Sequence, residues 1–280
     1  MSGLQGTDLL FRRWDAEPSP SAVAGPVPPK AVFLLVHGLG AHSGRWDFFA
    51  RAAAGRGYAS YAIELRGFGR TPERPRGHVA SFEVWHRDLL ALREAIGRDF
   101  PGKKVFLAGE SMGGLIAYDL AGRRPGLFAG AVLMAPAFKN GMKFPPGAYV
   151  KVALVTPFHP KSMVDLPFTS EMATRDPDYA AVMNESPDEL RVASLGLMRG
   201  FLPVQARAGR LARTFAAPAL FLVPGVDRLV DERAARRIFA RLAAADKTLI
   251  EYPDMFHALY IDLGRDKVFA DILDWTGTRA

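Results

Sequence analysis

The chain has 280 residues, 49% of them hydrophobic, and a formal net charge of +7 at pH 7, so it can bury a large core as one domain with an insertion. It contains no cysteine, which excludes disulfides and cysteine-ligated metals, and no apolar run approaches the roughly 18 residues of a membrane-spanning helix. The N-terminus lacks the basic start and apolar core of a signal peptide, so we expect a cytoplasmic location.

The basic residues are scattered among aspartate and glutamate, and they form only short pairs such as Arg12-Arg13 and Arg236-Arg237. This distribution favours a solvated basic surface over a nucleic-acid site. The same surface predicts at most a weak, salt-sensitive contact with an anionic membrane surface.

Strand-like and helix-like segments alternate through the first half of the chain. The expected elements are, in order, strand 9–14, strand 32–36, helix 48–54, strand 58–63, helix 82–96, strand 105–108, a helix from about 115, and strand 131–134. A proline-rich stretch at 17–29 is expected to be a loop. Such alternation predicts an α/β fold with a mainly parallel sheet and helices on both faces.

The pattern breaks between residues 137 and 203, where eight prolines and five of the nine methionines occur. It resumes with strands at 219–223 and 248–252 and a helix at 232–242. We therefore expect a core formed by residues 1–136 and 204–280, and a helical cap at 137–203. An insertion between strands, near their carboxyl ends, would cover an active site.

The motif Gly109-Glu110-Ser111-Met112-Gly113 joins a buried strand to a helix. This is the context of a nucleophile elbow, in which a sharp turn exposes the serine hydroxyl above a helix N-terminus. An ordinary glycine-rich turn is the simpler reading of the pentapeptide alone, and the residues downstream favour the catalytic one.

A serine nucleophile needs a base, and His257 is well placed in the loop after the last predicted strand. The acid should follow the preceding strand, where Asp227 lies. Asp231 is the competing acid, but it is better placed to cap the helix that begins at Glu232. Because the base must be neutral, we expect activity to fall below about pH 6–7, the range of an ordinary imidazole.

Acyl transfer also needs donors for the oxyanion. One is expected to be the Met112 amide, directly after the nucleophile, and the other the Leu39 amide, which follows strand 32–36. Gly38 and Gly40 on either side would let the backbone approach the substrate. His37 is expected to brace this loop through hydrogen bonds.

These motifs resemble the monoacylglycerol lipase and lysophospholipase branch of the α/β-hydrolase fold, also labelled serine aminopeptidase-like hydrolases. The matching segments lie at 37–46, 65–70, 109–114 and 225–230, and around His257. The resemblance implies Ser111, Asp227 and His257 as a catalytic triad, the Leu39 and Met112 amides as the oxyanion hole, and hydrolysis of an acylglycerol or similar ester without a cofactor or metal. The chain departs from the family at two positions. Ala41 stands where the family often has glutamate, and Glu110 where it often has histidine, although the glutamate form also occurs in plant-type members.

The methionines of the predicted cap could line an apolar site for flexible acyl chains. Together with Gly38, the predicted substrate-binding residues are Met142, Met163, Met172, Met183 and Met198. For any one methionine, ordinary packing within the cap is the simpler interpretation.

Other functions on the same scaffold stay open. A lysophospholipase, a general carboxylesterase or a thioesterase would use the same triad. An aminopeptidase would need acidic groups for a substrate ammonium, for which Glu171, Asp176 and Glu185 are candidates. A non-catalytic ligand receptor is the remote alternative. Epoxide hydrolases are disfavoured because they need a carboxylate where Ser111 stands.

Overall fold

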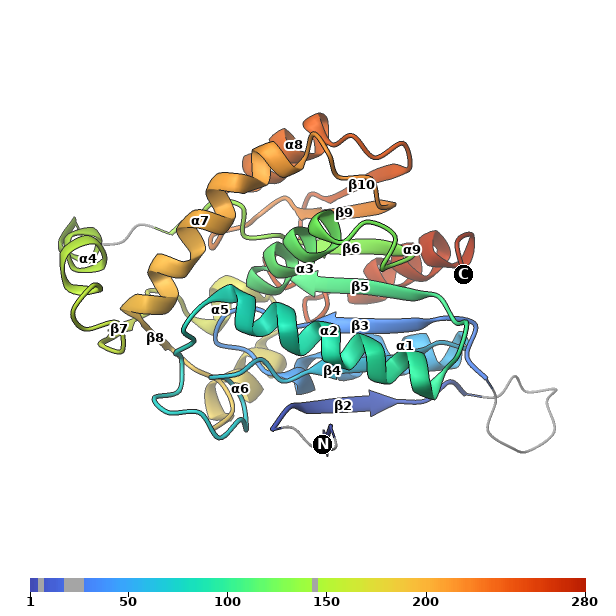
Figure 1. Cartoon of the computed structure of the whole chain (residues 1–280), viewed down its shortest axis with the longest axis horizontal. Coiled ribbons are helices and arrows are strands. Elements are labelled where there is room, and N and C mark those ends of the chain that lie inside the picture. The colour runs from blue at the N-terminus through green and yellow to red at the C-terminus, as the bar shows by residue number, and fades with distance from the viewer. Residues whose placement is uncertain (5–7, 18–27, 143–145) are drawn as a thin grey trace.

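The computed structural model describes residues 1–4, 8–17, 28–142 and 146–280. Most of the predicted loop at 17–29 therefore lies outside the described residues. An eight-stranded sheet forms the centre of the molecule, with the strand order β1-β2-β4-β3-β5-β6-β9-β10. Strand β2 pairs antiparallel with β1 and with β4, and the other neighbouring strands of this sheet pair in parallel. The predicted mostly parallel α/β fold is confirmed (Figure 1).

The strand positions follow the apolar runs of the sequence. The strands of the main sheet are β1 Ser2–Gly3, β2 Leu10–Trp14, β3 Val32–Val36, β4 Ala59–Ile63, β5 Val105–Glu110, β6 Gly130–Met134, β9 Ala219–Pro224 and β10 Lys247–Tyr252. The side chains of β3, β4, β5, β6 and β9 are buried throughout. Burial on both faces is what continuous apolar strands of a parallel sheet require.

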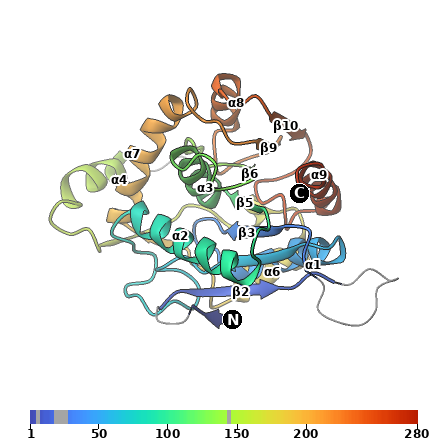
Figure 2. The same cartoon turned by 45° about the vertical axis from the view of Figure 1, so that its right-hand side comes forward.

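Helices cover both faces of the sheet, as the alternating pattern predicts (Figure 2). One face packs against α2 (Phe82–Asp99), α3 (Met112–Arg123) and α8 (Glu232–Arg241). The other face packs against α1 (Asp47–Gly55) and α9 (Arg265–Gly277). A short 3₁₀ helix, η1 (Ser43–Trp46), leads into α1. The loops at the carboxyl ends of the parallel strands thus lie between two helical layers and can carry a site.

The segment between β6 and β9, here called the insert (residues 135–218), lies beyond the carboxyl ends of the parallel strands (Figure 1). Its elements are α4 Pro146–Val150, the π-helix η2 Lys151–Val155, β7 Met163–Asp165, α5 Ser170–Ala173, α6 Pro177–Glu185, β8 Val192–Ser194 and α7 Leu195–Leu211. Strands β7 and β8 pair as a small antiparallel sheet, so the insert is not wholly helical. The boundary predicted at residue 203 falls inside α7, which runs back to the core.

Candidate active site

Ser111 lies at the sharp turn between β5 and α3. Its φ of 55° and ψ of −117° place it in a region that non-glycine residues seldom adopt. The turn is tight because two glycines remove side chains from it: a Cβ added at Gly113 would collide with the Val36 carbonyl, and one at Gly109 with the Gly113 carbonyl. Within the described residues, the Ser111 hydroxyl makes no hydrogen bond, so it is free to meet a ligand.

Asp227 and His257 are brought together from two loops. Nδ1 of His257 donates to Oδ2 of Asp227 at 2.7 Å, and the Asp227 side chain is fully buried. Its other oxygen accepts hydrogen bonds from the amides of Leu229 and Val230, at 2.8 and 3.0 Å. These bonds fix the carboxylate and, through it, the orientation of the imidazole. Asp231, the competing acid, caps α8 by accepting from the Arg233 amide, as predicted.

A second carboxylate occupies the other side of the imidazole. Glu110 Oε1 lies 3.2 Å from Nε2 of His257, the atom that would have to accept the Ser111 proton. Burial lowers the pKa of His257, but the Asp227 and Glu110 carboxylates outweigh burial and raise it to about 10. In this structure the imidazole is therefore held between two carboxylates. The expected loss of activity below about pH 6–7 assumed an ordinary imidazole pKa. The raised pKa of His257 moves the expected loss to higher pH.

The loop after β3 is braced as the sequence predicts. The ring of His37 donates from Nδ1 to the Gly38 carbonyl at 2.9 Å and accepts at Nε2 from the Leu65 amide at 3.1 Å. Complete burial lowers the pKa of His37 to about 4, so the ring is neutral and structural. Within the described chain, the Leu39 amide donates to no other backbone group. Met112 begins α3, so its amide is one of the helix N–H groups without an intrahelical acceptor.

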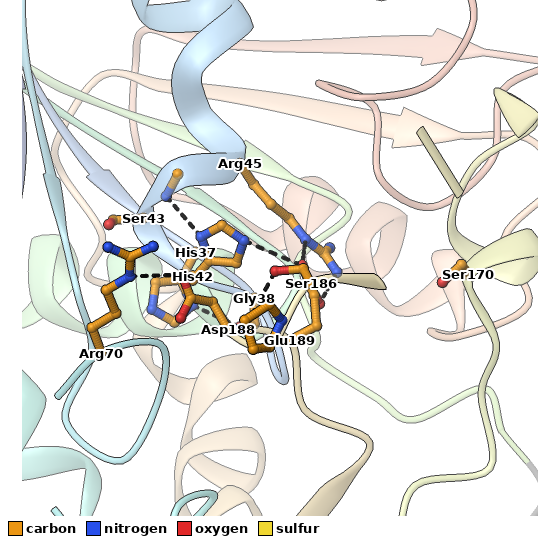
Figure 3. A network of polar contacts seen from close by, with 12 residues as sticks. His37, Gly38, His42, Ser43, Arg45, Arg70, Ser170, Ser186, Asp188 and Glu189 are labelled. Atoms are coloured by element: carbon orange, nitrogen blue, oxygen red, sulfur yellow. Dashed lines mark hydrogen bonds and ion pairs between the residues drawn. The ribbon is translucent and has the colours of Figure 1, made fainter. Parts of the chain in front are cut away.

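The insert holds this loop and the segments beside it from the other side (Figure 3). The buried guanidinium of Arg45, in η1, donates to both oxygens of Glu189, at 2.6 and 2.5 Å, and Arg70, in the loop after β4, donates to Asp188 at 2.9 Å. The Leu190 amide donates to the Gly40 carbonyl at 2.8 Å. Core and insert therefore fix the same loop, which limits the freedom of the amides that face the site.

A cavity of about 1040 Å³ opens above Ser111, between the strand ends and the insert. It is lined by Gly38, Leu39, Ser111, Met112 and His257, and by four of the five predicted methionines, namely Met142, Met163, Met183 and Met198. Met172 does not line this cavity and packs against the hydrophobic cluster that contains Met183 and Tyr260. In α5 it is Ala173 that lines the cavity, and the adjacent residue of a helix points about 100° away.

Sequence reasoning treated Glu110 only as a departure from the family pattern and did not predict that it would contact the imidazole. A carboxylate at the end of an otherwise apolar strand, next to the nucleophile, was the available signal. Asp227, His257 and Glu110 now form one buried charged group beside Ser111, and such clusters mark functional sites.

Comparison with known proteins identifies the family. Residues 27–264 match the family model "Serine aminopeptidase, S33", and the chain belongs to this family of α/β-hydrolases. Human monoglyceride lipase is 32% identical over 255 residues, covering 90% of this chain and 84% of that protein. Phospholipase YtpA of Bacillus subtilis is 28% identical over 244 residues, covering 86% and 93%. The crystal structure of the monoacylglycerol lipase of Paleococcus ferrophilus superposes with a TM-score of 0.86 at 26% identity, covering 98% of this chain and 100% of that one. The chain is a carboxylic ester hydrolase.

Proposed function

We propose that this enzyme hydrolyses monoacylglycerols through an acyl-enzyme on Ser111. Human monoglyceride lipase, among the relatives that cover most of the chain, supports this substrate. The observation that carries the mechanism is that Ser111, at its strained turn, and His257, which is held by Asp227, line one largely apolar cavity. The methionines of the insert would surround the acyl chain, and the insert would act as a cap.

In this mechanism Nε2 of His257 first leaves Glu110 and forms a hydrogen bond with the Ser111 hydroxyl. Neutral His257 takes the serine proton as the oxygen attacks the ester carbonyl, and Asp227 stabilises the imidazolium that forms. The oxyanion accepts hydrogen bonds from the Leu39 and Met112 amides. His257 then protonates the leaving glycerol, and water releases the fatty acid by the same steps in reverse order.

The acidic residues considered for an aminopeptidase do not support that alternative. Asp176 caps α6 and pairs with Arg265 at 2.8 Å, and Glu171 is exposed on α5. Neither they nor Glu185 line the cavity. The lysophospholipase, carboxylesterase and thioesterase alternatives use the same chemistry and differ only in the alcohol or thiol that leaves.

Contact with a membrane surface is part of the proposal. Exposed apolar side chains gather on one part of the insert, where Val150, Leu154 and Phe158 are 54%, 68% and 79% exposed. Lys151 lies among them. Among the described residues, no helix combines the length and the apolar character that crossing a bilayer would take. Apolar side chains flanked by a cation suit shallow insertion at a lipid surface.

The test is a substrate series with one matched variant. Monoacylglycerols of several chain lengths, a nitrophenyl ester and an aminoacyl anilide are compared for the wild type and for Ser111→Ala. Ser81→Ala serves as control, because Ser81 is exposed and its hydroxyl caps nothing. We expect monoacylglycerol turnover, a loss of kcat of about 10⁴–10⁶-fold in Ser111→Ala, and fluorophosphonate labelling of the wild type and the control only. Anilide turnover above ester turnover would favour the peptidase. Absence of labelling in folded wild type would favour the receptor.

A further inference from the structure

Glu110 is a buried carboxylate with one oxygen unused. Its side chain is 2% exposed, and within the described residues Oε2 has no hydrogen-bond partner. A buried polar atom without a partner is costly, so such an atom at a ligand cavity indicates a contact that the ligand completes. Glu110 lines the same cavity as Ser111.

The free oxygen lies close to the nucleophile. A Cβ added at Gly38 would lie 2.5 Å from Glu110 Oε2 and 3.2 Å from the Cβ of Ser111. Oε2 therefore packs against the backbone of Gly38, beside the turn that carries Ser111.

The Glu110 carboxylate lies on the alcohol side of the ester. The leaving oxygen must receive its proton from Nε2 of His257, and Glu110 Oε1 lies 3.2 Å from that atom. The apolar methionines of the insert are left for the acyl chain. When the imidazole turns towards Ser111, Glu110 Oε1 loses its hydrogen-bond donor, His257. Both oxygens of the buried carboxylate then need new hydrogen-bond donors.

Among the described residues, Glu110 forms an ion pair with His257 alone. The cavity is also lined by Arg45, Lys151 and Arg199, but none of them pairs with Glu110, and the Arg45 guanidinium is held by both oxygens of Glu189. An anionic group on the alcohol would therefore meet a carboxylate at short range, and like charges in a site of low dielectric repel strongly.

We propose that Glu110 is a specificity-determining residue whose carboxylate accepts hydrogen bonds from the alcohol portion of the ester, selecting uncharged, hydroxyl-bearing alcohols and rejecting phosphorylated ones. The proposal rests on the proposed function and narrows it to neutral polyol esters, at the expense of the anionic lysophospholipid alternative. In this proposal Glu110, the residue before the nucleophile, helps to select the leaving group.

The test compares three esters of one acyl chain in identical mixed micelles: the methyl ester, the monoacylglycerol and the acylglycerol phosphate. The methyl ester has no hydroxyl, and the phosphate adds negative charge. The variants are Glu110→Ala, which removes the acceptor, and Glu110→Gln, which keeps an acceptor oxygen without charge. Glu171→Gln is the control, because Glu171 is an exposed carboxylate of α5 that does not line the cavity. Each result is a ratio of kcat/KM values within one variant, so the fraction of folded enzyme cancels.

In Glu110→Ala we expect the ratio of monoacylglycerol to methyl ester to fall about 10- to 100-fold, the factor for a hydrogen bond to a charged group. In Glu110→Gln this ratio should fall less, while the ratio of phosphate to monoacylglycerol should rise about tenfold or more. Glu171→Gln should change neither. Unchanged ratios in both Glu110 variants overturn the role of Glu110 and leave the proposed function standing. Failure of the wild type to cleave any of the three esters overturns the proposed function itself.

Discussion

Replacing Glu110 with glutamine should make the enzyme faster at neutral pH on an ester whose alcohol offers no hydroxyl. Burial lowers the pKa of His257, and the carboxylates of Asp227 and Glu110 raise it to about 10. Only the neutral imidazole can accept the Ser111 proton. The kcat/KM of the wild type should therefore rise about tenfold per pH unit between about pH 7 and pH 9, because kcat/KM reports the pKa values of the free enzyme.

The size of the effect follows from the contact. The Glu110 Oε1 to His257 Nε2 pair at 3.2 Å is a charge-assisted hydrogen bond, which contributes roughly 1.5–3 kcal/mol. Since one pKa unit corresponds to about 1.36 kcal/mol, the glutamine variant should move the acid limb down by about 1–2 pH units. Near pH 7 it should hydrolyse a short nitrophenyl ester about 10- to 100-fold faster than the wild type. Tyr260 does not disturb this range, because burial and Glu110 raise its pKa well above the usual value.

The assay is a pH profile of kcat/KM at constant ionic strength, with spontaneous hydrolysis subtracted at each pH. Glu171→Gln should retain the wild-type profile. Two results refute the reasoning: superimposable profiles for the wild type and Glu110→Gln, or a wild-type acid limb at the ordinary imidazole pKa. Either would mean that Glu110 does not hold the proton on His257 in solution.

Two further predictions concern the insert. Replacing Leu154 and Phe158 with serine should lower partitioning to anionic vesicles at low salt, measured by sedimentation, while hydrolysis of a soluble ester stays unchanged. Replacing the exposed Leu263 with serine is the control. Equal partitioning of the wild type and both variants would contradict membrane contact through the insert. Asp119→Ala should lower the free energy of unfolding by about 2–4 kcal/mol in urea, because a buried carboxylate bonded twice by Arg207 of α7 is lost. An unchanged unfolding midpoint would show that this ion pair does not tie the insert to α3.

The sheet could be predicted because the residues of each strand are sufficient to identify it. Val32–Val36 and Ala219–Pro224 are continuous apolar runs between turn residues, and such runs are buried wherever the sheet is covered on both faces. The start of α3 was placed three residues too late. Gly113 and Gly114 are poor helix formers, but here close approach to neighbouring backbone requires them. The strands of the insert, β7 and β8, have three residues each, which is too few for a period to be recognised.

The positions of Asp227 and His257 could be predicted because the order of the triad residues along the chain ties them to the ends of particular strands. The contact of Glu110 with His257 depends on side-chain rotamers, which no sequence pattern encodes. The alternation of side chains along a strand does indicate which way Glu110 faces. Phe106 and Ala108 pack in the same cluster as Ala258, Leu259 and Tyr260, so residue 110, two positions on, faces the loop that carries His257. A carboxylate on that face must find a donor in a buried place. The nearest is the imidazole that the reaction needs, so in the resting enzyme the base is bound by the residue that precedes the nucleophile.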